Sequence, residues 1–276
     1  MQVFLKKERF ENMSCSEKVQ FSFVAPSIRP HLWKQFCASL RNTKLNWEVV
    51  FVGPKEPEEK FPSNVRHIKT NVKPSQCTHI GFLEAKGEIV SLTADDAQYF
   101  SPNRKSAVDN MYEFIKNFPS DINYDKDNIA YGFRMFEDKF CTETSLTHYL
   151  TKSNNFTAPL LYPFFAIHKE TYMSIGGYDT GFICGQAEND FLIRIAVKYG
   201  ATVNSLCSNA MVWADHEDHG NTGKFREYHA KENEYLRSLW INQENKYVID
   251  RLKGLQQYKN DDSLLLVTQG EKGEWE

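Results

Sequence analysis

Two short acidic stretches contain side chains that could do chemistry. Asp95 and Asp96 stand next to each other in "SLTADDAQYF", residues 91–100. Adjacent carboxylates repel each other, so the pair predicts either a solvated turn, where Asp is common, or a site for a divalent cation. Glu188 and Asp190 in "AENDFLIR" could take a proton from a hydroxyl group. The alternative is that these two acids only complement the dipole at the start of a helix.

A histidine-containing stretch offers a further ligand. In "DHEDH", residues 215–219, a neutral His216 imidazole could bind a metal ion or a diphosphate. The alternative is a solvated acidic loop in which His216 and His219 are incidental. The H-E-x-H spacing differs from the H-E-x-x-H of zinc proteases, so that class of enzyme is not predicted.

The first hundred residues alternate between strand and helix patterns. Apolar, β-rich runs predict strands within residues 19–30, 46–54, 64–70 and 88–96, and helical spacing predicts helices within 31–43 and 75–87. This order is typical of a mostly parallel sheet with helices on its faces. Ligands bind such sheets beyond the carboxyl ends of the strands, where residues 26–29, Gly53 and the pair Asp95–Asp96 are expected to lie.

The second half of the chain continues the pattern with more loop. We expect a helix over residues 106–118, a strand over 128–138, another apolar run at 160–179 and a helix from 187 to Gly200. One or two strands follow before residue 220. Beyond about residue 225 the chain is charged, and the spacing of Leu236, Leu239 and Trp240 predicts a C-terminal helical appendage.

Composition limits the classes of function. The chain has 276 residues, of which 41% are hydrophobic and 25% charged, as in an ordinary soluble domain. A net charge of −3 gives no electrostatic reason to expect nucleic acid or an anionic membrane as partner. The six cysteines form no C-x-x-C pair, which argues against a zinc or disulfide framework. No secretory signal or transmembrane segment is recognisable, so we expect a soluble, cytoplasmic or otherwise intracellular protein.

The order of these pieces resembles family 2-like glycosyltransferases of the GT-A (Rossmann-like) fold. The resemblance covers about residues 21–222, between a lead of residues 1–20 and a helical extension of residues 223–276. It is carried by "FSFVAPSIRP", "GFLEAKGEIVSLTADDAQYFSP", "YPFFAIHKETYMSIGGYDTGF", "AENDFLIR" and "AMVWADHEDHG", which stand in the order of that family. A metal-assisted, inverting transfer of sugar from a UDP- or GDP-linked donor to a glycan, protein or lipid acceptor is the implied activity.

The resemblance also implies roles for individual residues. Asp96 falls on the second acid of the Asp-x-Asp motif and would bind Mn2+ or Mg2+ with His216, whereas Ala94 replaces the first acid. Glu188 falls on the general base and Asp190 on a second acid. The residues implied in donor binding are Pro26, Ser27, Arg29, Gly53 and Asp95, and those implied in acceptor binding are Gly177, Tyr178 and Asp179.

Two other classes of protein remain open. A nucleotidyltransferase would share the sheet and the acids, but it usually has a glycine-rich phosphate loop after the first strand, and "APSIRP" contains no glycine. A non-catalytic module that binds nucleotide sugars or glycans is favoured by the departures at Ala94 and Glu188. A dinucleotide-binding enzyme is not predicted, because no G-x-G-x-x-G follows the first strand.

Overall fold

The computed structural model describes residues 18–117, 130–137, 140–141, 164–191, 194, 204–214 and 226–240. Four parallel strands form its first half, in the spatial order β3-β2-β1-β4. These strands are β1 (Phe21–Pro26), β2 (Trp47–Gly53), β3 (Val65–Lys69) and β4 (Ile89–Leu92). A 3-10 turn η1 (Pro30–Leu32) leads into α1 (Trp33–Ser39) after β1, and α2 (Pro74–Glu84) follows β3. The predicted alternation is confirmed here.

The second half extends the same sheet in the order β4-β8-β6-β9-β5, with β7 paired to β6. Its elements are β5 (Ala97–Phe100), α3 (Ala107–Lys116), β6 (Ala130–Glu137), β7 (Phe140–Cys141), β8 (Phe165–His168), α5 (Lys169–Ser174), β9 (Asn204–Ala214) and α7 (Arg226–Trp240). Strands β6 and β9 run parallel to each other, whereas β8 and β5 are antiparallel to their neighbours. The sheet is mostly parallel and flanked by helices, as predicted.

Both faces of the sheet are buried, which is typical of parallel sheets in α/β proteins. Alternate residues of β1 point to opposite faces: Phe21, Phe23 and Ala25 pack with α1 and α3, and Val24 packs with α2. On the α1 side, Trp33 stacks on Phe51 with ring centroids 4.0 Å apart. These two apolar layers hold the strands rigidly, so the loops at their carboxyl ends start from fixed positions.

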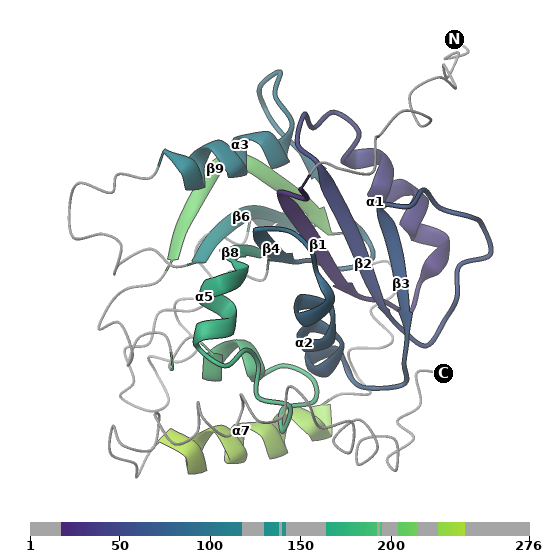
Figure 1. Cartoon of the computed structure of the whole chain (residues 1–276). Coiled ribbons are helices and arrows are strands. Elements are labelled where there is room, and N and C mark those ends of the chain that lie inside the picture. Colours follow the sequence, from purple (N-terminus) through teal and green to yellow (C-terminus); the bar gives the residue numbers. More distant parts are fainter. Residues whose placement is uncertain are drawn as a thin grey trace.

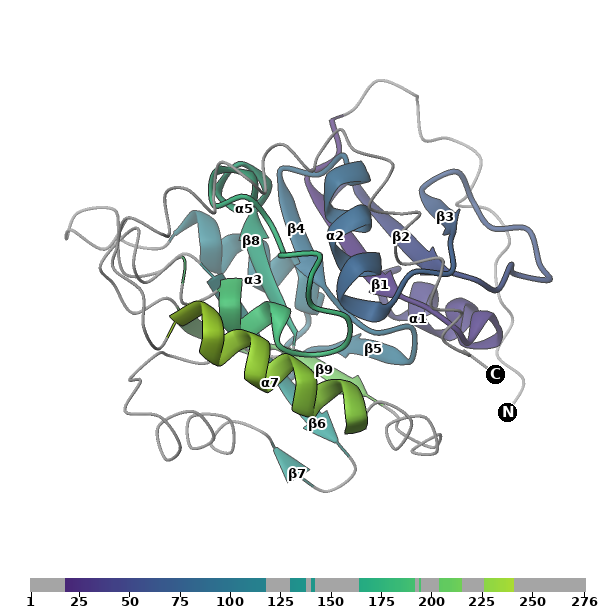
Figure 2. The same ribbon diagram turned by 90° about the horizontal axis from the view of Figure 1, so that it is seen from below.

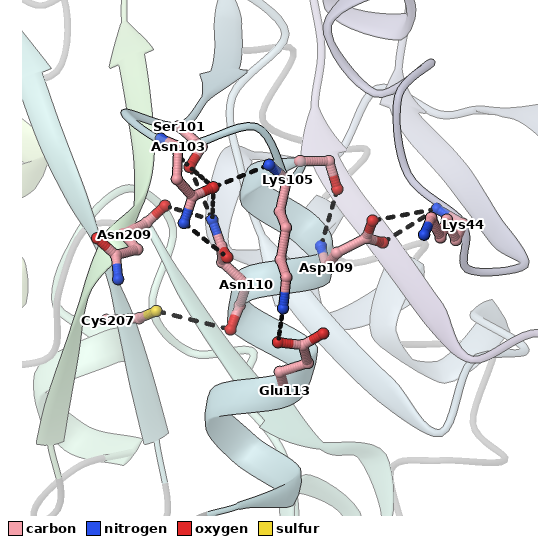
Figure 3. Close-up of polar contacts among 10 residues, drawn as sticks. Lys44, Ser101, Asn103, Lys105, Asp109, Asn110, Glu113, Cys207 and Asn209 are labelled. Atoms are coloured by element: carbon pink, nitrogen blue, oxygen red, sulfur yellow. Dashed lines mark hydrogen bonds and ion pairs between the residues drawn. The ribbon is translucent and has the colours of Figure 1, made fainter.

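A polar cluster fastens α3 to the far end of the sheet (Figure 3). The buried Asn110 side chain donates to Ser101 Oγ at 2.7 Å and to the Asn209 carbonyl of β9 at 2.9 Å. Asp109 accepts from the backbone N–H of Lys44 at 3.0 Å, in the loop after α1. The helix that follows the acidic pair is therefore tied both to β9 and to the first half of the sheet.

Helix α7 runs along one edge of the molecule, the edge at which β3 ends and α2 begins (Figures 1 and 2). Its Leu236 and Leu239 are buried in the cluster that covers the α2 face of the sheet. Residues 226–240 of the predicted C-terminal helical extension therefore form a helix that packs on the domain, and the rest of that extension, residues 223–225 and 241–276, lies outside the described residues. Among the described residues, no helix is both long and apolar enough to cross a membrane.

Candidate functional site

Asp95 ties the end of β4 to the loop that follows β1. Its carboxylate, 1% exposed, accepts hydrogen bonds from Ser27 Oγ at 2.9 Å and from the backbone N–H groups of Ile28 and Arg29 at 2.9 and 2.8 Å. The Arg29 guanidinium adds two further bonds, from Nε at 2.9 Å and from Nη2 at 2.6 Å. All of these hydrogen-bond donors belong to residues 27–29, so Asp95 fixes the Ser27–Arg29 loop at the carboxyl end of β1.

Arg29 also contacts the second acid of the pair. Its Nη1 lies 2.9 Å from Oδ2 of Asp96, so one guanidinium bridges both carboxylates. Burial disfavours the charged guanidinium, but the two carboxylates outweigh this effect and raise the pKa of Arg29 above its ordinary value. The repulsion expected between Asp95 and Asp96 is thus relieved by a cation, and in this structure that cation is Arg29.

Gly53, at the end of β2, completes this side of the site because only a glycine fits there. A Cβ atom at position 53 would lie 1.8 Å from the backbone oxygen of Ser27. The Ser27 hydroxyl in turn accepts a hydrogen bond from Trp33 Nε1 at 2.6 Å. The structure therefore brings together Pro26, Ser27, Arg29, Gly53, Asp95 and Asp96, as expected from the sequence.

The residues around Asp96 fit a divalent cation only in part. Carboxylate oxygen is the ligand that Mn2+ and Mg2+ prefer, but the first acid of the motif is Ala94 and the Asp95 oxygens are held by the β1 loop. Within the described ranges, no three His, Cys, Asp or Glu side chains gather in a way that could hold a metal ion. His216, the other predicted ligand, lies outside the described residues. Any cation bound here would compete with Arg29 for Asp96.

Glu188 stands in the first turn of a helix that begins at Ala187. Its side chain is partly exposed, unlike Asp190 two residues later, which is fully buried. Burial of the carboxyl group, together with the nearby negative charge of Glu232, raises the pKa of Glu188 to about 7. A carboxyl group with a pKa near neutrality can accept a proton and release it again at physiological pH.

Asp190 is buried and forms an ion pair with Arg194. Its Oδ2 accepts from Arg194 Nε at 2.9 Å, and both side chains are 0% exposed. Arg194 also donates to the carbonyl oxygens of Ile175 at 2.8 Å and Gly177 at 2.5 Å. The pair therefore anchors the turn at residues 176–177, and Asp190 does not face solvent. Of the two predicted catalytic acids, only Glu188 keeps any solvent exposure in this structure.

The predicted acceptor segment begins with two glycines of positive φ. Gly176 has φ 90° and Gly177 has φ 69°, and a Cβ on Gly177 would lie 2.6 Å from the His79 ring. The following residue, Tyr178, is 1% exposed and packs among aromatic rings of the core. The Tyr178 ring, which the sequence implied in acceptor binding, is therefore covered in this conformation, because burial of the large ring is favourable. Asp179 accepts from the Gly181 N–H at 2.8 Å.

The donor residues around Asp95 and the acceptor segment that leads to Glu188 lie at the same edge of the sheet. Strands β1 to β4 are parallel, so their carboxyl ends share one edge, and α2 starts there after β3. The first turn of α2 binds the acceptor segment: the Ser75 N–H donates to the Ile183 carbonyl at 3.1 Å and Gln76 Nε2 donates to the Thr180 carbonyl at 3.0 Å. The segment leading to Glu188 therefore lies at the edge of the sheet where the turn with Asp95 and Asp96 follows β4.

Sequence reasoning missed one polar contributor, Glu232 of α7. This buried carboxylate accepts from the backbone N–H groups of Ile183, Cys184 and Gly185. Nothing in "REYHAKENEYLRSLW" distinguishes Glu232 from the exposed Glu234 except its spacing of four residues from Leu236, which places both on one helix face.

Comparison with known proteins identifies the fold. No protein family model and no curated protein sequence matches this chain. The structure resembles residues 1–349 of S. aureus TarS in complex with UDP, with a TM-score of 0.50 and 11% identity over 92% of this chain and 88% of that one. It also resembles the mannosyltransferase PcManGT from Pyrobaculum calidifontis in complex with GDP-Man and Mn2+, with a TM-score of 0.50 and 13% identity over 93% of this chain and 74% of that one. The chain therefore has a GT-A-like glycosyltransferase fold, as its sequence motifs predict.

Proposed function

We propose that the protein is a glycosyltransferase that moves a sugar from a UDP- or GDP-linked donor to a hydroxyl group on a glycan, protein or lipid. The observation that carries this proposal is Glu188, whose carboxyl group has a pKa raised to about 7 by burial and which lies at the carboxyl edge of a GT-A-like sheet. The similar structures, which are complexes with UDP and with GDP-Man and Mn2+, support the donor class and a divalent cation.

The donor end of the site is formed by the β1 and β2 loops. The Ser27–Arg29 loop and Gly53 lie together at the sheet edge, and the close approach of their backbones leaves no side chain between them. The Arg29 side chain is 20% exposed while it bridges the two acids. All three of its nitrogens contact the two acids, but each terminal nitrogen carries a second N–H, and these can bind the oxygens of a diphosphate.

Asp96 and His216 are the residues that would hold a divalent cation. When bound, such an ion supplies Lewis-acid stabilisation of the departing diphosphate. The protein's own part is to keep the Asp96 carboxylate at the end of β4, where the neighbouring Asp95 and the β1 loop hold the backbone in place.

Glu188 is the proposed general base of an inverting displacement. Its carboxylate takes the proton of the acceptor hydroxyl while that oxygen forms a bond to the anomeric carbon from the face opposite the diphosphate. The bond between the anomeric carbon and the diphosphate oxygen breaks, and the electron pair leaves with the nucleoside diphosphate. Base catalysis of this kind contributes about 10²–10⁴-fold to a rate.

A thermal-shift and turnover panel tests the proposal. Nucleotide sugars are added with and without Mn2+; a donor that binds only the folded protein must raise its melting temperature by mass action. We expect a UDP- or GDP-linked sugar to stabilise the protein and to be consumed, by slow hydrolysis or by transfer to an added acceptor. Stabilisation without any consumption would favour the binding-module alternative, and no stabilisation by any nucleotide sugar would contradict the proposal.

A further inference from the structure

The C-terminal helix buries a single carboxylate against the segment that precedes Glu188. Glu232 is 4% exposed, although its helix neighbours Lys231, Asn233 and Glu234 are exposed. Glutamate is almost never buried unless it is paired, and here the partners are three consecutive backbone N–H groups. These belong to Ile183, to Cys184 at 2.6 Å and to Gly185 at 3.0 Å.

These three donors belong to the loop that leads into the helix of Glu188. The loop ends at Gln186, whose carbonyl accepts the first helical bond, from the Asp190 N–H at 3.0 Å. One end of the loop is held by α2 through Ser75, and its middle is held by Glu232. The direction in which the Glu188 helix leaves the loop is therefore fixed by contacts from two different helices.

Neighbouring contacts make α7 a fixed support for this loop. The Tyr235 hydroxyl donates to Asp179 Oδ2 at 3.1 Å, and the Tyr235 ring lies 4.9 Å from the ring of Phe182. Leu236 and Leu239 are buried in the same cluster as Ala187 and Phe191, on either side of Glu188. α7 thus contacts the acceptor segment and the base helix together.

Among the described residues, several titratable groups act electrostatically on Glu188. Glu232 faces it from α7, and the hydroxyls of Tyr172 and Tyr178 and the Cys184 thiol lie within electrostatic reach. The positive charge of Lys73, at the start of α2, also acts on Cys184. Burial is the largest cause of the raised pKa of Glu188, and Glu232 adds to it in the same direction.

We propose that Glu232 is a positioning residue for the general base, so that α7 belongs to the catalytic unit of this protein. Glu232 fixes the 183–185 loop through three backbone bonds and places a second negative charge beside the carboxyl group of Glu188. This inference rests on the proposed role of Glu188, but it has consequences that can be measured without turnover.

The test compares Glu232→Gln, which keeps the size and removes the charge, with Glu234→Gln, two residues away on the exposed face of the same helix. The carboxyl carbon of Glu188, assigned with Glu188→Gln, is titrated by NMR. We expect Glu232→Gln to lower the pKa of Glu188, because a nearby like charge has been removed, and Glu234→Gln to leave it unchanged. The acidic limb of kcat/KM should move to lower pH by the same amount. An unchanged pKa of Glu188 in folded Glu232→Gln would overturn the proposal.

A second measurement covers the case in which Glu232→Gln does not fold. In the wild type, the amide hydrogens of Cys184 and Gly185 should exchange with solvent at least about tenfold more slowly than unbonded loop amides. Unprotected amides at both positions would overturn the proposal, whereas protection lost in Glu232→Asp, whose arm is one methylene shorter, would support it. Since neither readout needs a substrate, failure of this inference is distinct from failure of the proposed activity.

Discussion

Replacing Arg29 by Ala tests how the acidic pair is held. The change removes two hydrogen bonds to Asp95, at 2.9 and 2.6 Å, and the 2.9 Å ion pair to Asp96. Both carboxylate side chains are 1% exposed, so they would remain side by side without their cation. Breaking a buried pair costs about 3–5 kcal/mol. Arg29 itself is 20% exposed, so water can take part of its place and we expect a loss of about 2–4 kcal/mol.

The assay is urea unfolding of the variant and of Arg66→Ala. Arg66 is a matched control: it binds the buried Glu48 at 3.0 Å and the Glu84 carbonyl at 2.7 Å, at the opposite edge of the sheet. Both variants should lose stability, but only Arg29→Ala should then gain more from Mn2+ than the wild type gains, since the ion can take the place of the guanidinium beside Asp96. A free energy of unfolding within about 0.5 kcal/mol of wild type would refute the reasoning.

Three further predictions concern single residues. Asp190→Asn should act on stability more than on chemistry, with a loss of about 3–5 kcal/mol by urea unfolding, because it leaves the fully buried Arg194 without its charged partner; a stable variant with lost turnover would contradict this. Gly53→Ala should weaken donor binding, measured by calorimetry with UDP and GDP, because its Cβ would collide with the Ser27 carbonyl and shift the β1 loop; wild-type affinity would count against the placement of the donor. The pH dependence of kcat/KM should show an acidic limb near pH 7, because Glu188 must be deprotonated to act and its pKa is raised to about 7; a limb near pH 4.5, the ordinary value for Glu, would contradict this.

The sequence predicts the helices and strands of this fold better than it predicts which strands pair and in which direction. Helices α1, α2 and α3 and strands β1 to β4 follow from apolar spacing, which depends on residues close in the chain. Strand β5, directly after the acidic pair, was missed because "AQYF" is too short to show a period. The antiparallel direction of β8 depends on pairing with β4, about 75 residues earlier, and no local pattern encodes it.

The candidate site shows the same division. The positions of Asp95 and Asp96 after a buried strand could be predicted, but not the bridge from Arg29, which joins residues 66 positions apart. The burial of Asp190 and Tyr178 depends on Arg194 and on the aromatic rings around it, and Glu232 is a charged residue in a polar helix. Such roles become visible only when α5, α7 and the loop before residue 187 are placed together.

The most direct test of the proposed function is turnover by Glu188→Gln, with Glu170→Gln, an exposed residue of α5, as the control. The amide keeps the shape of the side chain and removes its basicity, so donor binding by calorimetry should be unchanged while kcat falls by about 10²–10⁴-fold. The anomeric configuration of the wild-type product, followed by NMR, should be inverted relative to the donor. Near wild-type turnover by Glu188→Gln, or a product that retains the donor configuration, would contradict an inverting transfer with Glu188 as its base.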